Sequence, residues 1–277
     1  MIFVCLLLTF CIFSLPALAQ ESQWENISSG LEYRYFKAEV RSFAGDSLIH
    51  VLRIDPQQWE LKLYSISEED EQNRFTLADW SKKFDLTAVI NAGMYYTDFR
   101  THSGFMKSGE HINNPGIVKD YYSAAAFGPY DDTFPLFKIF DLDETELDEI
   151  IDNYDYVIQN LRLIKRPGEN RWTQQNKRWS EAALGEDSRG NALFIITGSP
   201  YSMYDFNEIL LSLPLDIVAA QHLEGGEQAQ MYIKHGGYEL NINGSYETLF
   251  TGPDGNPFTA PIPNIIGIKI KTDSVNR

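Results

Sequence analysis

Two glutamates and two glycines stand together in the stretch HLEGGEQAQMY, residues 222–232. Glu224 closes an apolar run, Gly225 and Gly226 follow it directly, and Glu227 supplies a second carboxylate. Adjacent glycines let a substrate approach the backbone closely and leave two N–H groups available to its oxygen atoms. Enzymes that cleave glycosidic bonds usually use a pair of carboxylates as catalytic groups. The stretch predicts either such a site, with Glu224 as general acid/base or as the partner of a sugar hydroxyl, or a tight turn carrying two solvated glutamates.

A second polar group ends another apolar run, in AVINAGMYY at residues 88–96. Gly93 permits a turn with positive φ, after which the amide of Asn91 can point into a cleft. Tyr95 follows two residues later and could stack on a sugar ring, although such aromatic side chains also serve as core residues. An Asx turn that only ends the strand explains the spacing of Asn91 and Gly93 equally well.

A third group gathers cations and amides within an otherwise acidic chain. The segment begins with VIQNLRLIKRPGENRW at residue 157. Guanidinium groups offer fork-shaped donors that match phosphate or carboxylate. Ordinary surface charges that offset a neighbouring acidic segment would give the same composition. The members of the group are Gln159, Asn160, Arg162, Arg166, Arg171 and Arg178.

Other chemistries are excluded by what the sequence lacks. It contains no G-x-S-x-G elbow, no H-E-x-x-H and no G-x-G-x-x-G. The formal net charge of −16 argues against nucleic acid as a partner, because binding a phosphate backbone needs a basic face. The five histidines show no short metal-ligand spacing. We therefore expect no organic cofactor, and a divalent metal is conceivable from the carboxylates without any identifiable ligand set.

The first 19 residues have the character of an export signal. An apolar run there ends in Ala-Leu-Ala, the small-x-small pattern of a signal-peptidase site. A membrane anchor is the alternative, because the run is nearly long enough to span a bilayer. Cleavage would remove Cys5 and Cys11, the only cysteines, and with them any thiol chemistry. The sequence predicts a secreted or periplasmic protein of residues 20–277, without stable membrane insertion.

Short strands and single helices must position these groups. Residues 33–66 alternate between apolar and polar in the way of strands and predict an N-terminal antiparallel meander. Thr76 with Asp79, and Ser202 with Asp205, predict capping boxes at the starts of two helices. Further strands are expected at 86–90, 156–164, 192–198, 215–223 and 264–271.

The acidic segment DLDETELDEIIDNYD, residues 141–155, fails as a calcium loop because its turn position is Glu146 rather than glycine. Its apolar residues have helical spacing, and Asp143 and Glu146 are expected to cap the helix. No repeat or long linker interrupts the chain. The sequence therefore predicts one α+β domain over 20–277, with mixed, largely antiparallel sheets, interspersed helices and a cleft at the ends of the strands that carry Asn91 and Glu224.

Four short motifs then follow one another in a recognisable order: VINAGMY, QNLRLI, AALGED with SRGNALFIIT, and LEGG. Between about residues 85 and 270 the chain resembles the phosphodiester glycosidase family. The departures from that pattern are concentrated in the motifs. Glu224 replaces the aspartate of the family, Glu227-Gln228 replaces Gly-Ser, and Asn160-Leu161-Arg162 replaces Ser-Gly-Pro. Glu181 stands where the family has an arginine, a role that Arg178 would have to take over.

The resemblance implies a hydrolase that releases a sugar from a sugar-1-phosphodiester, in an envelope glycan or a related substrate. Catalytic roles are then expected for Glu224, Arg178 and Asn91. The altered motif residues would also suit a carbohydrate-binding envelope protein that kept the cleft and lost hydrolysis, and this alternative stays open. The expected substrate-binding residues are Gly93, Tyr95, Gln159, Asn160, Arg162, His222, Gly225, Gly226 and Glu227.

Overall fold

The computed structural model describes residues 22–69, 74–244 and 260–271. The signal segment expected at residues 1–19 lies outside the described residues. Strands dominate the structure, and three α-helices are spread between them, so the α+β class is confirmed. Every strand pairing among the described residues is antiparallel, including those that involve strands far apart in the sequence.

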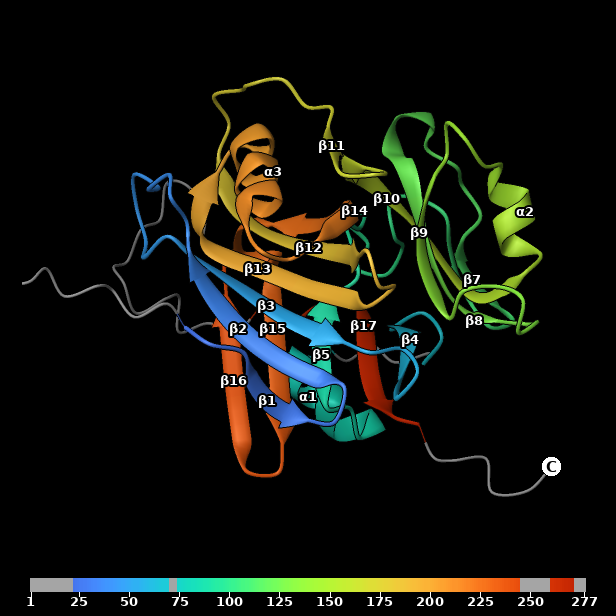
Figure 1. Ribbon diagram of the computed structural model, residues 1–277. Coiled ribbons are helices and arrows are strands. Elements are labelled where there is room, and N and C mark those ends of the chain that lie inside the picture. The colour runs from blue at the N-terminus through green and yellow to red at the C-terminus, as the bar shows by residue number, and fades with distance from the viewer. Residues whose placement is uncertain (1–21, 70–73, 245–259, 272–277) are drawn as a thin grey trace, which may run out of the picture.

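The larger sheet extends in Figure 1 from the blue N-terminal strands, through the yellow and orange strands above them, to the green strands at the right. Its main path runs through β1 (Glu25–Ser28), β2 (Leu31–Lys37), β3 (Leu48–Ile54), β13 (Ala192–Tyr201), β12 (Trp179–Asp187), β14 (Ile217–Gly225), β10 (Tyr154–Lys165), β6 (Met106–Ser108) and β7 (His111–Asn114). β8 (Tyr122–Pro129) pairs with β10 and with β9 (Phe137–Asp141), and β11 (Glu169–Asn170) pairs with the end of β10.

The smaller sheet packs against the larger one and runs in the order β16 (Tyr238–Asn243), β15 (Gln230–His235), β5 (Ala88–Asn91), β17 (Asn264–Ile270) and β4 (Trp59–Ser65). β2 and β3 pair as expected. β4 instead leaves them and pairs with β17, so residues 33–66 do not form one meander. The alternation of apolar and polar residues correctly predicts that β4 is a strand, but such periodicity does not indicate which strand pairs with it.

The main core lies between the two sheets. Leu52 and Phe194 of the larger sheet and Ile90, Met231 and Ile266 of the smaller sheet belong to one buried cluster. Inward-facing apolar residues alternate with polar ones along β4 and β2, which is why each sheet has one face suited to this interface. The packing fixes the position of β14 over β5 and β15, and thus of the segments that carry the predicted site.

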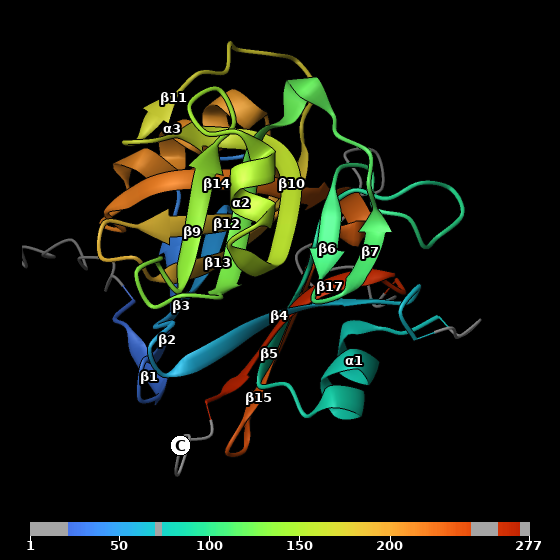
Figure 2. The same ribbon diagram turned by 90° about the vertical axis from the view of Figure 1, so that its right-hand side faces the viewer.

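The outer faces are covered by helices (Figures 1 and 2). α3 (Met203–Ser212) packs Phe206 and Leu210 on the larger sheet. α1 (Leu77–Phe84) packs Leu77 and Trp80 on the smaller sheet. α2 (Leu147–Ile151) lies against the strands of the β8–β10 layer through Leu147 and Ile150.

The helix caps test local sequence reasoning directly. The capping box of Thr76 and Asp79 is present in both directions, so that prediction is confirmed. The Ser202 side chain accepts from the backbone N–H of Asp205, as expected at the start of α3. The predicted cap of α2 is wrong, because Glu146 makes no side-chain cap bond and Asp143 binds Arg162 and Lys165 instead.

Candidate active site

The chain passes from the larger sheet to the smaller one at the segment Glu224–Gln230. β14 ends at Gly225, a short 3-10 helix η2 (Gly226–Gln228) follows, and β15 begins at Gln230. Gly226 has φ of +67°, a left-handed conformation that a side chain disfavours. Gly225 has an extended backbone, yet a Cβ there would lie 2.4 Å from Cδ1 of Trp179. The two glycines therefore permit the turn and the close packing at the end of β14.

Glu224 is half-buried at this strand end. Its Oε1 accepts a hydrogen bond from the N–H of Gly225 at 3.1 Å. Burial raises the pKa of the Glu224 carboxyl, and a charge on His222 and the Gly225 hydrogen bond offset only part of that rise. A raised carboxyl pKa keeps a proton available for donation at a pH where an ordinary glutamate has lost it.

A buried pair lies beside Glu224, on β12 and β14. Nδ1 of His222 bonds to Oε1 of Glu181, and Nε1 of Trp179 donates to the other carboxylate oxygen of Glu181 at 2.7 Å. Glu181 and His222 are 2 % and 3 % exposed, so the pair is almost sealed from water. A register shift in the β12–β14 pairing places Ala183 opposite His222 and Ala182 opposite Glu224.

The charges of this group act on one another. Burial raises the pKa of Glu181, and His222 and Trp179 offset part of that shift. For His222, burial disfavours the imidazolium, but the carboxylates of Glu181 and then Glu224 outweigh it, and the pKa of the ring is raised. Neighbouring titratable groups with perturbed pKa values are typical of functional sites, including sites that transfer protons.

Asn91 lies across the sheet junction, at the end of β5, and is 1 % exposed. Its Oδ1 accepts from the N–H of Gln230 at 3.0 Å, while Nε2 of Gln230 donates to the carbonyl of Glu227 at 2.9 Å. Nδ2 of Asn91 is buried and has no hydrogen-bond partner among the described residues. Asn91 is thus connected to the Glu227 segment through one residue, Gln230.

Gly93 allows β5 and β10 to approach each other. A Cβ on Gly93 would lie 2.3 Å from Oδ1 of Asn160 and 2.5 Å from Cε1 of His102. Nδ2 of Asn160 donates to the carbonyl of Ala92 at 3.0 Å. Its Oδ1 is buried and has no partner in the part of the chain that the structure describes. The glycine therefore serves close packing of Asn160 against the end of β5.

Several fully buried polar atoms near this junction lack a partner among the described residues. Oγ of Ser123 donates to the backbone carbonyl of Asn160 at 2.7 Å and lies 3.3 Å from Oε1 of Gln221, so the Gln221 side chain lies close to the backbone of β10. Unpaired buried amides are costly unless water or a ligand completes their hydrogen bonds. The unpaired atoms are Nδ2 of Asn91, Oδ1 of Asn160, Nε2 of Gln221 and Oε1 of Gln230.

Gln159 holds a loop rather than facing the Glu224 segment. Its Oε1 accepts from the N–H of Val118 at 2.9 Å and from that of Phe105 at 3.3 Å, and its Nε2 donates to the carbonyl of Val118 at 2.9 Å. Tyr95 bridges His102 in backbone pairing and meets the ring of Phe99 edge-on at 5.4 Å. Both side chains support the loops that flank the junction.

The two arginines expected to hold phosphate point to acidic partners. Nη1 of Arg162 lies 3.0 Å from Asp141 and 2.7 Å from Asp143, and its guanidinium stands over the ring of Tyr122. Nη2 of Arg178 lies 3.8 Å from Asp205 at the start of α3. The structure thus brings together Glu224, His222, Gly225, Gly226 and Glu227 on one segment, with Asn91, Gly93 and Asn160 beside it, and turns Arg162 and Arg178 elsewhere.

Sequence reasoning missed the role of Glu181 as the partner of His222 and the place of Tyr121 near Glu224. Glu181 is a lone carboxylate in the buried run SEAALG, and that contrast was the available signal. Tyr121, in the short helix η1 (Lys119–Tyr121), hydrogen-bonds Ser103 at 2.9 Å. Burial raises the pKa of its phenol, the Ser103 hydrogen bond offsets part of that rise, and Tyr96 and then the charge of Glu224 add smaller contributions. No spacing in the sequence connects Tyr121 with Glu224.

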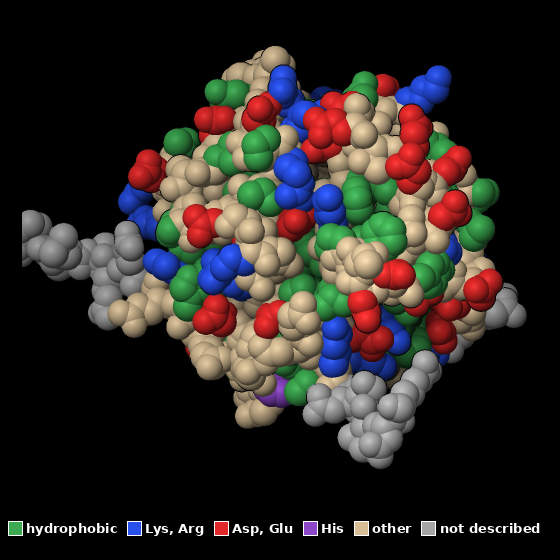
Figure 3. Space-filling model, turned by 45° about the vertical axis from the view of Figure 1, so that its right-hand side comes forward, with side chains coloured by type: hydrophobic (Ala, Val, Ile, Leu, Met, Phe, Trp, Pro, Cys, Tyr) green, Lys and Arg blue, Asp and Glu red, His purple; other side chains and the backbone are tan. Residues whose placement is uncertain are grey.

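In the part of the chain that the structure describes, no group of three or more His, Cys, Asp or Glu side chains is arranged to hold a metal ion. Helices long and apolar enough to cross a membrane are likewise absent from these residues. Acidic and basic side chains are interspersed over the face drawn in Figure 3.

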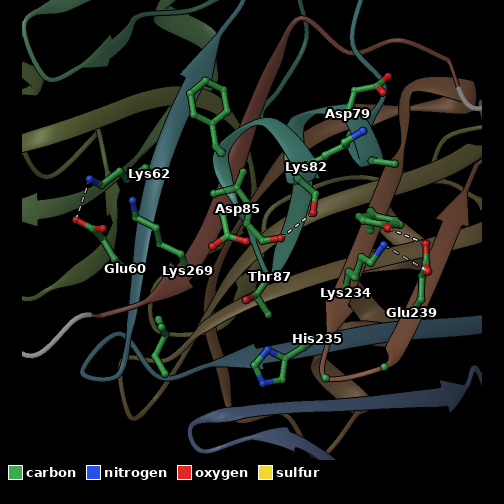
Figure 4. A pocket seen from close by; sticks show the side chains of 18 residues that line it. Glu60, Lys62, Asp79, Lys82, Asp85, Thr87, Lys234, His235, Glu239 and Lys269 are labelled. Carbon is green, nitrogen blue, oxygen red and sulfur yellow. Dashed lines mark hydrogen bonds and ion pairs between the residues drawn. The ribbon is translucent and has the colours of Figure 1, made fainter.

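A hollow away from Glu224 lies between α1 and the smaller sheet (Figure 4). It has a volume of about 1260 Å³, and none of the predicted site residues lines it. Its charges are mixed: Lys62 lies 3.1 Å from Glu60, and Lys234 lies 3.9 Å from Glu239. This hollow therefore offers no continuous surface of one charge.

The sequence model of the phosphodiester glycosidases matches residues 84–269, about the span expected from the motifs. The chain belongs to the phosphodiester glycosidase family. None of the curated protein sequences compared with the chain matches it.

Two solved structures share the fold. The catalytic domain of zebrafish N-acetylglucosamine-1-phosphodiester alpha-N-acetylglucosaminidase, auto-inhibited by its pro-peptide, has a TM-score of 0.57 at 15 % identity, over 90 % of this chain and 87 % of that one. A hypothetical protein from Synechocystis has a TM-score of 0.64 at 14 % identity, over 92 % of this chain and 65 % of that one. At such identities the likeness shows a common fold for this glycosidase family member.

The placement of Arg178 gives a first prediction. We expect Arg178→Ala to change kcat/KM toward a sugar-1-phosphodiester by less than about fivefold, because its guanidinium lies beside Asp205 and a partly exposed ion pair contributes only about 0–1 kcal/mol to folding. Steady-state kinetics of purified protein would measure the effect, with Arg171→Ala, another surface pair member, as the matched control. A loss of a hundredfold or more specific to Arg178 would show that its guanidinium turns from Asp205 to the substrate.

Proposed function

We propose that this phosphodiester glycosidase family member hydrolyses the bond between the anomeric carbon of a sugar and a phosphodiester oxygen. The observation that carries the proposal is the position of Glu224: a half-buried carboxyl with a raised pKa near the end of β14, followed by Gly225 and Gly226. A carboxyl group with these properties can protonate the bridging oxygen as the bond to the anomeric carbon breaks.

The surrounding groups supply binding. Gly225 and Gly226 hold the end of β14 in place, since Gly225 packs closely against Trp179 and Gly226 adopts a positive φ, and they thereby fix the position of the Glu224 carboxyl. The buried, unpaired amide atoms of Asn91 and Asn160 are suited to exchange hydrogen bonds with sugar hydroxyls or with ordered water. The bond between the anomeric carbon and the bridging oxygen breaks, and the phosphate leaves as a monoester that takes the proton from Glu224. The water that attacks the anomeric carbon loses a proton to solvent, and Glu224 takes up a proton from solvent before the next turnover.

The cellular setting is part of the same proposal. Residues 1–19 would direct export and be removed, and the remaining chain would act in the periplasm or outside the cell on an envelope glycan or a related sugar phosphate. The net charge of −16 suits a soluble exported protein and opposes binding to nucleic acid.

A substrate panel tests the activity. We expect residues 20–277 to release free sugar from methyl-phosphodiesters of glucose-1-phosphate, N-acetylglucosamine-1-phosphate or a related sugar, and not from the matching methyl glycosides that lack phosphate. Sugar-1-phosphate monoesters serve as a second control for contaminating phosphatases. The absence of release from every diester, at protein concentrations that would reveal one turnover, would overturn the proposal.

One observation favours a second candidate, a carbohydrate-binding protein without hydrolysis. The guanidinium groups of Arg162 and Arg178 face acidic side chains, so neither is positioned to hold a substrate phosphate. Calorimetric binding of the same diesters separates the two candidates, because binding without release by the wild-type protein supports the binding module.

A further inference from the structure

The proposed reaction needs a positive group for the phosphodiester, which carries a negative charge. Arg162 is engaged by Asp141 and Asp143, and Arg178 lies beside Asp205. An anion brought to the buried end of β14 without a counter-charge would bear a high desolvation cost. Among the described residues next to Glu224, the side chain able to carry a positive charge is His222.

Hydrogen bonds fix the orientation of that ring. Trp179 donates to one oxygen of Glu181, and the other oxygen of Glu181 bonds to Nδ1 of His222. An ionised carboxylate only accepts hydrogen bonds, so Nδ1 must carry a proton. Nε2 of His222 is therefore the ring nitrogen that can donate a hydrogen bond to a ligand, and it has no hydrogen-bond partner among the described residues.

A buried histidine–carboxylate pair can serve stability alone, but two features distinguish this pair. The ring lies two residues before Glu224 on the same strand, so its charge acts on the carboxyl proposed to transfer the proton. The resemblance to the family also places Glu181 at a position where an arginine is expected, and here the carboxylate instead supports a cation on the neighbouring strand. The positively charged side chain is thus His222 on β14 in this chain, and not an arginine on β12.

We propose that Glu181 holds His222 as an imidazolium whose Nε2–H binds a phosphate oxygen of the substrate. This inference rests on the proposed function for its substrate. His222 then replaces a guanidinium as the anion-binding group, and Glu181 and Trp179 are positioning residues that act through it. Specificity for a phosphodiester over a neutral glycoside follows from this single charge.

The charge state is set by the groups that face the ring. Glu181 on β12 and Glu224 on β14 are the carboxyl groups that act on His222. With Glu181 ionised, His222 protonated and Glu224 protonated, the three groups are together neutral before substrate binds. Such a neutral set avoids an uncompensated charge in a buried place. As pH rises through the raised pKa of His222, the cation is lost and diester binding weakens.

The direct test follows the His222 ring by nitrogen-15 NMR, with His222→Asn used to assign its signals. In the wild-type protein we expect His222 to titrate above the range of an ordinary histidine and its Nε2 signal to respond to dimethyl phosphate. Glu181→Gln keeps the shape of the side chain, but its amide can donate to Nδ1 of a neutral ring. The titration of His222 should then fall by at least about one pH unit, a tenfold change in proton affinity.

Binding measurements extend the test. Calorimetry with a methyl sugar-1-phosphodiester should show Glu181→Gln weakening affinity about tenfold or more near pH 7, with Glu181→Asp restoring part of it. The matching neutral methyl glycoside is the control, and its affinity should not change. Thermal unfolding of each variant shows whether the fold survives, and the wild-type NMR titration decides the matter even if Glu181→Gln does not fold.

The outcomes separate this inference from the proposed function. A neutral His222 across the pH range of diester binding, or no response of Nε2 to dimethyl phosphate, overturns the inference even when hydrolysis is observed. Diester binding that follows the titration of His222 without any release of sugar sustains the inference and overturns the hydrolase.

Discussion

Glu224→Gln is expected to lower kcat/KM for a sugar-1-phosphodiester by about 10²–10⁴-fold, the usual contribution of a general acid. Glutamine keeps the size of the side chain and its acceptor for the N–H of Gly225, but it has no proton to transfer. Because Glu224 must be protonated to act, kcat/KM of the wild-type protein should fall as pH rises through the raised pKa of this carboxyl. Rates of sugar release measured over a pH series would show both effects.

Glu227→Gln is the matched control, since it makes the same chemical change three residues later, in η2. We expect a much smaller loss than for Glu224→Gln. Folding gives a second check. The raised pKa means that the folded state binds more protons than the unfolded chain, so the Glu224 carboxyl costs stability as pH rises from its ordinary pKa through the raised one. Glu224→Gln should therefore be at least as stable as wild type at neutral pH, and retention of full activity in this variant would contradict the assigned role.

Gly225→Ala is expected to lower kcat/KM by about 10- to 100-fold, the scale of a displacement near 1 Å in a catalytic group. The backbone of Gly225, with φ of −119° and ψ of 171°, has a conformation that alanine can adopt without strain. The expected loss of activity therefore comes from a steric clash of the new side chain. The new Cβ would lie 2.4 Å from Cδ1 of Trp179, a rigid ring held by its hydrogen bond to Glu181. Displacing Trp179 disturbs Glu181, and through it His222.

Gly198→Ala on β13 provides the comparison, because its Cβ would meet Asn243 at 3.6 Å, an ordinary contact. Kinetics and thermal unfolding should be measured for both variants. Overpacking at Gly225 is also expected to cost about 1–3 kcal/mol of folding free energy. Equal kinetics of Gly225→Ala and Gly198→Ala would show that the Trp179–Glu181 pair does not support the site.

Features governed by neighbours in sequence could be predicted from sequence. The Thr76–Asp79 capping box needs only a three-residue spacing, and the structure contains it. The apolar strand that ends at Glu224 and the strand that ends at Asn91 also have nearly the expected bounds. Each of these depends on periodicity or local hydrogen bonding, which a single sequence displays.

Features that depend on contacts between residues far apart in the sequence could not be predicted from the sequence. Asp143 looked like a helix cap because of its spacing, but Arg162 and Lys165 of β10 reach it across the β8–β10 layer. β4 continued an alternating pattern, yet its neighbour is β17, more than two hundred residues along the chain. The guanidinium of Arg178 was expected at the site and lies instead beside Asp205, because α3 packs on the same sheet.

The pair of Glu181 and His222 illustrates why the chemistry of a site is hard to read from motifs. Taken singly, Glu181 is a departure from the family pattern and His222 is an isolated histidine. Only the pairing of β12 with β14 brings them into contact. In our proposal, the imidazolium of His222 takes the place of the arginine that the family resemblance leads one to expect at Glu181.

The central claim is tested most directly by determining which bond of the substrate is cleaved. Hydrolysis of a sugar-1-phosphodiester in water enriched with oxygen-18, followed by mass spectrometry of both products, locates the attack. A glycosidase that protonates the bridging oxygen through Glu224 places the label on the anomeric carbon of the released sugar. Label found in the phosphate would mean cleavage of the phosphorus–oxygen bond, and would contradict the account.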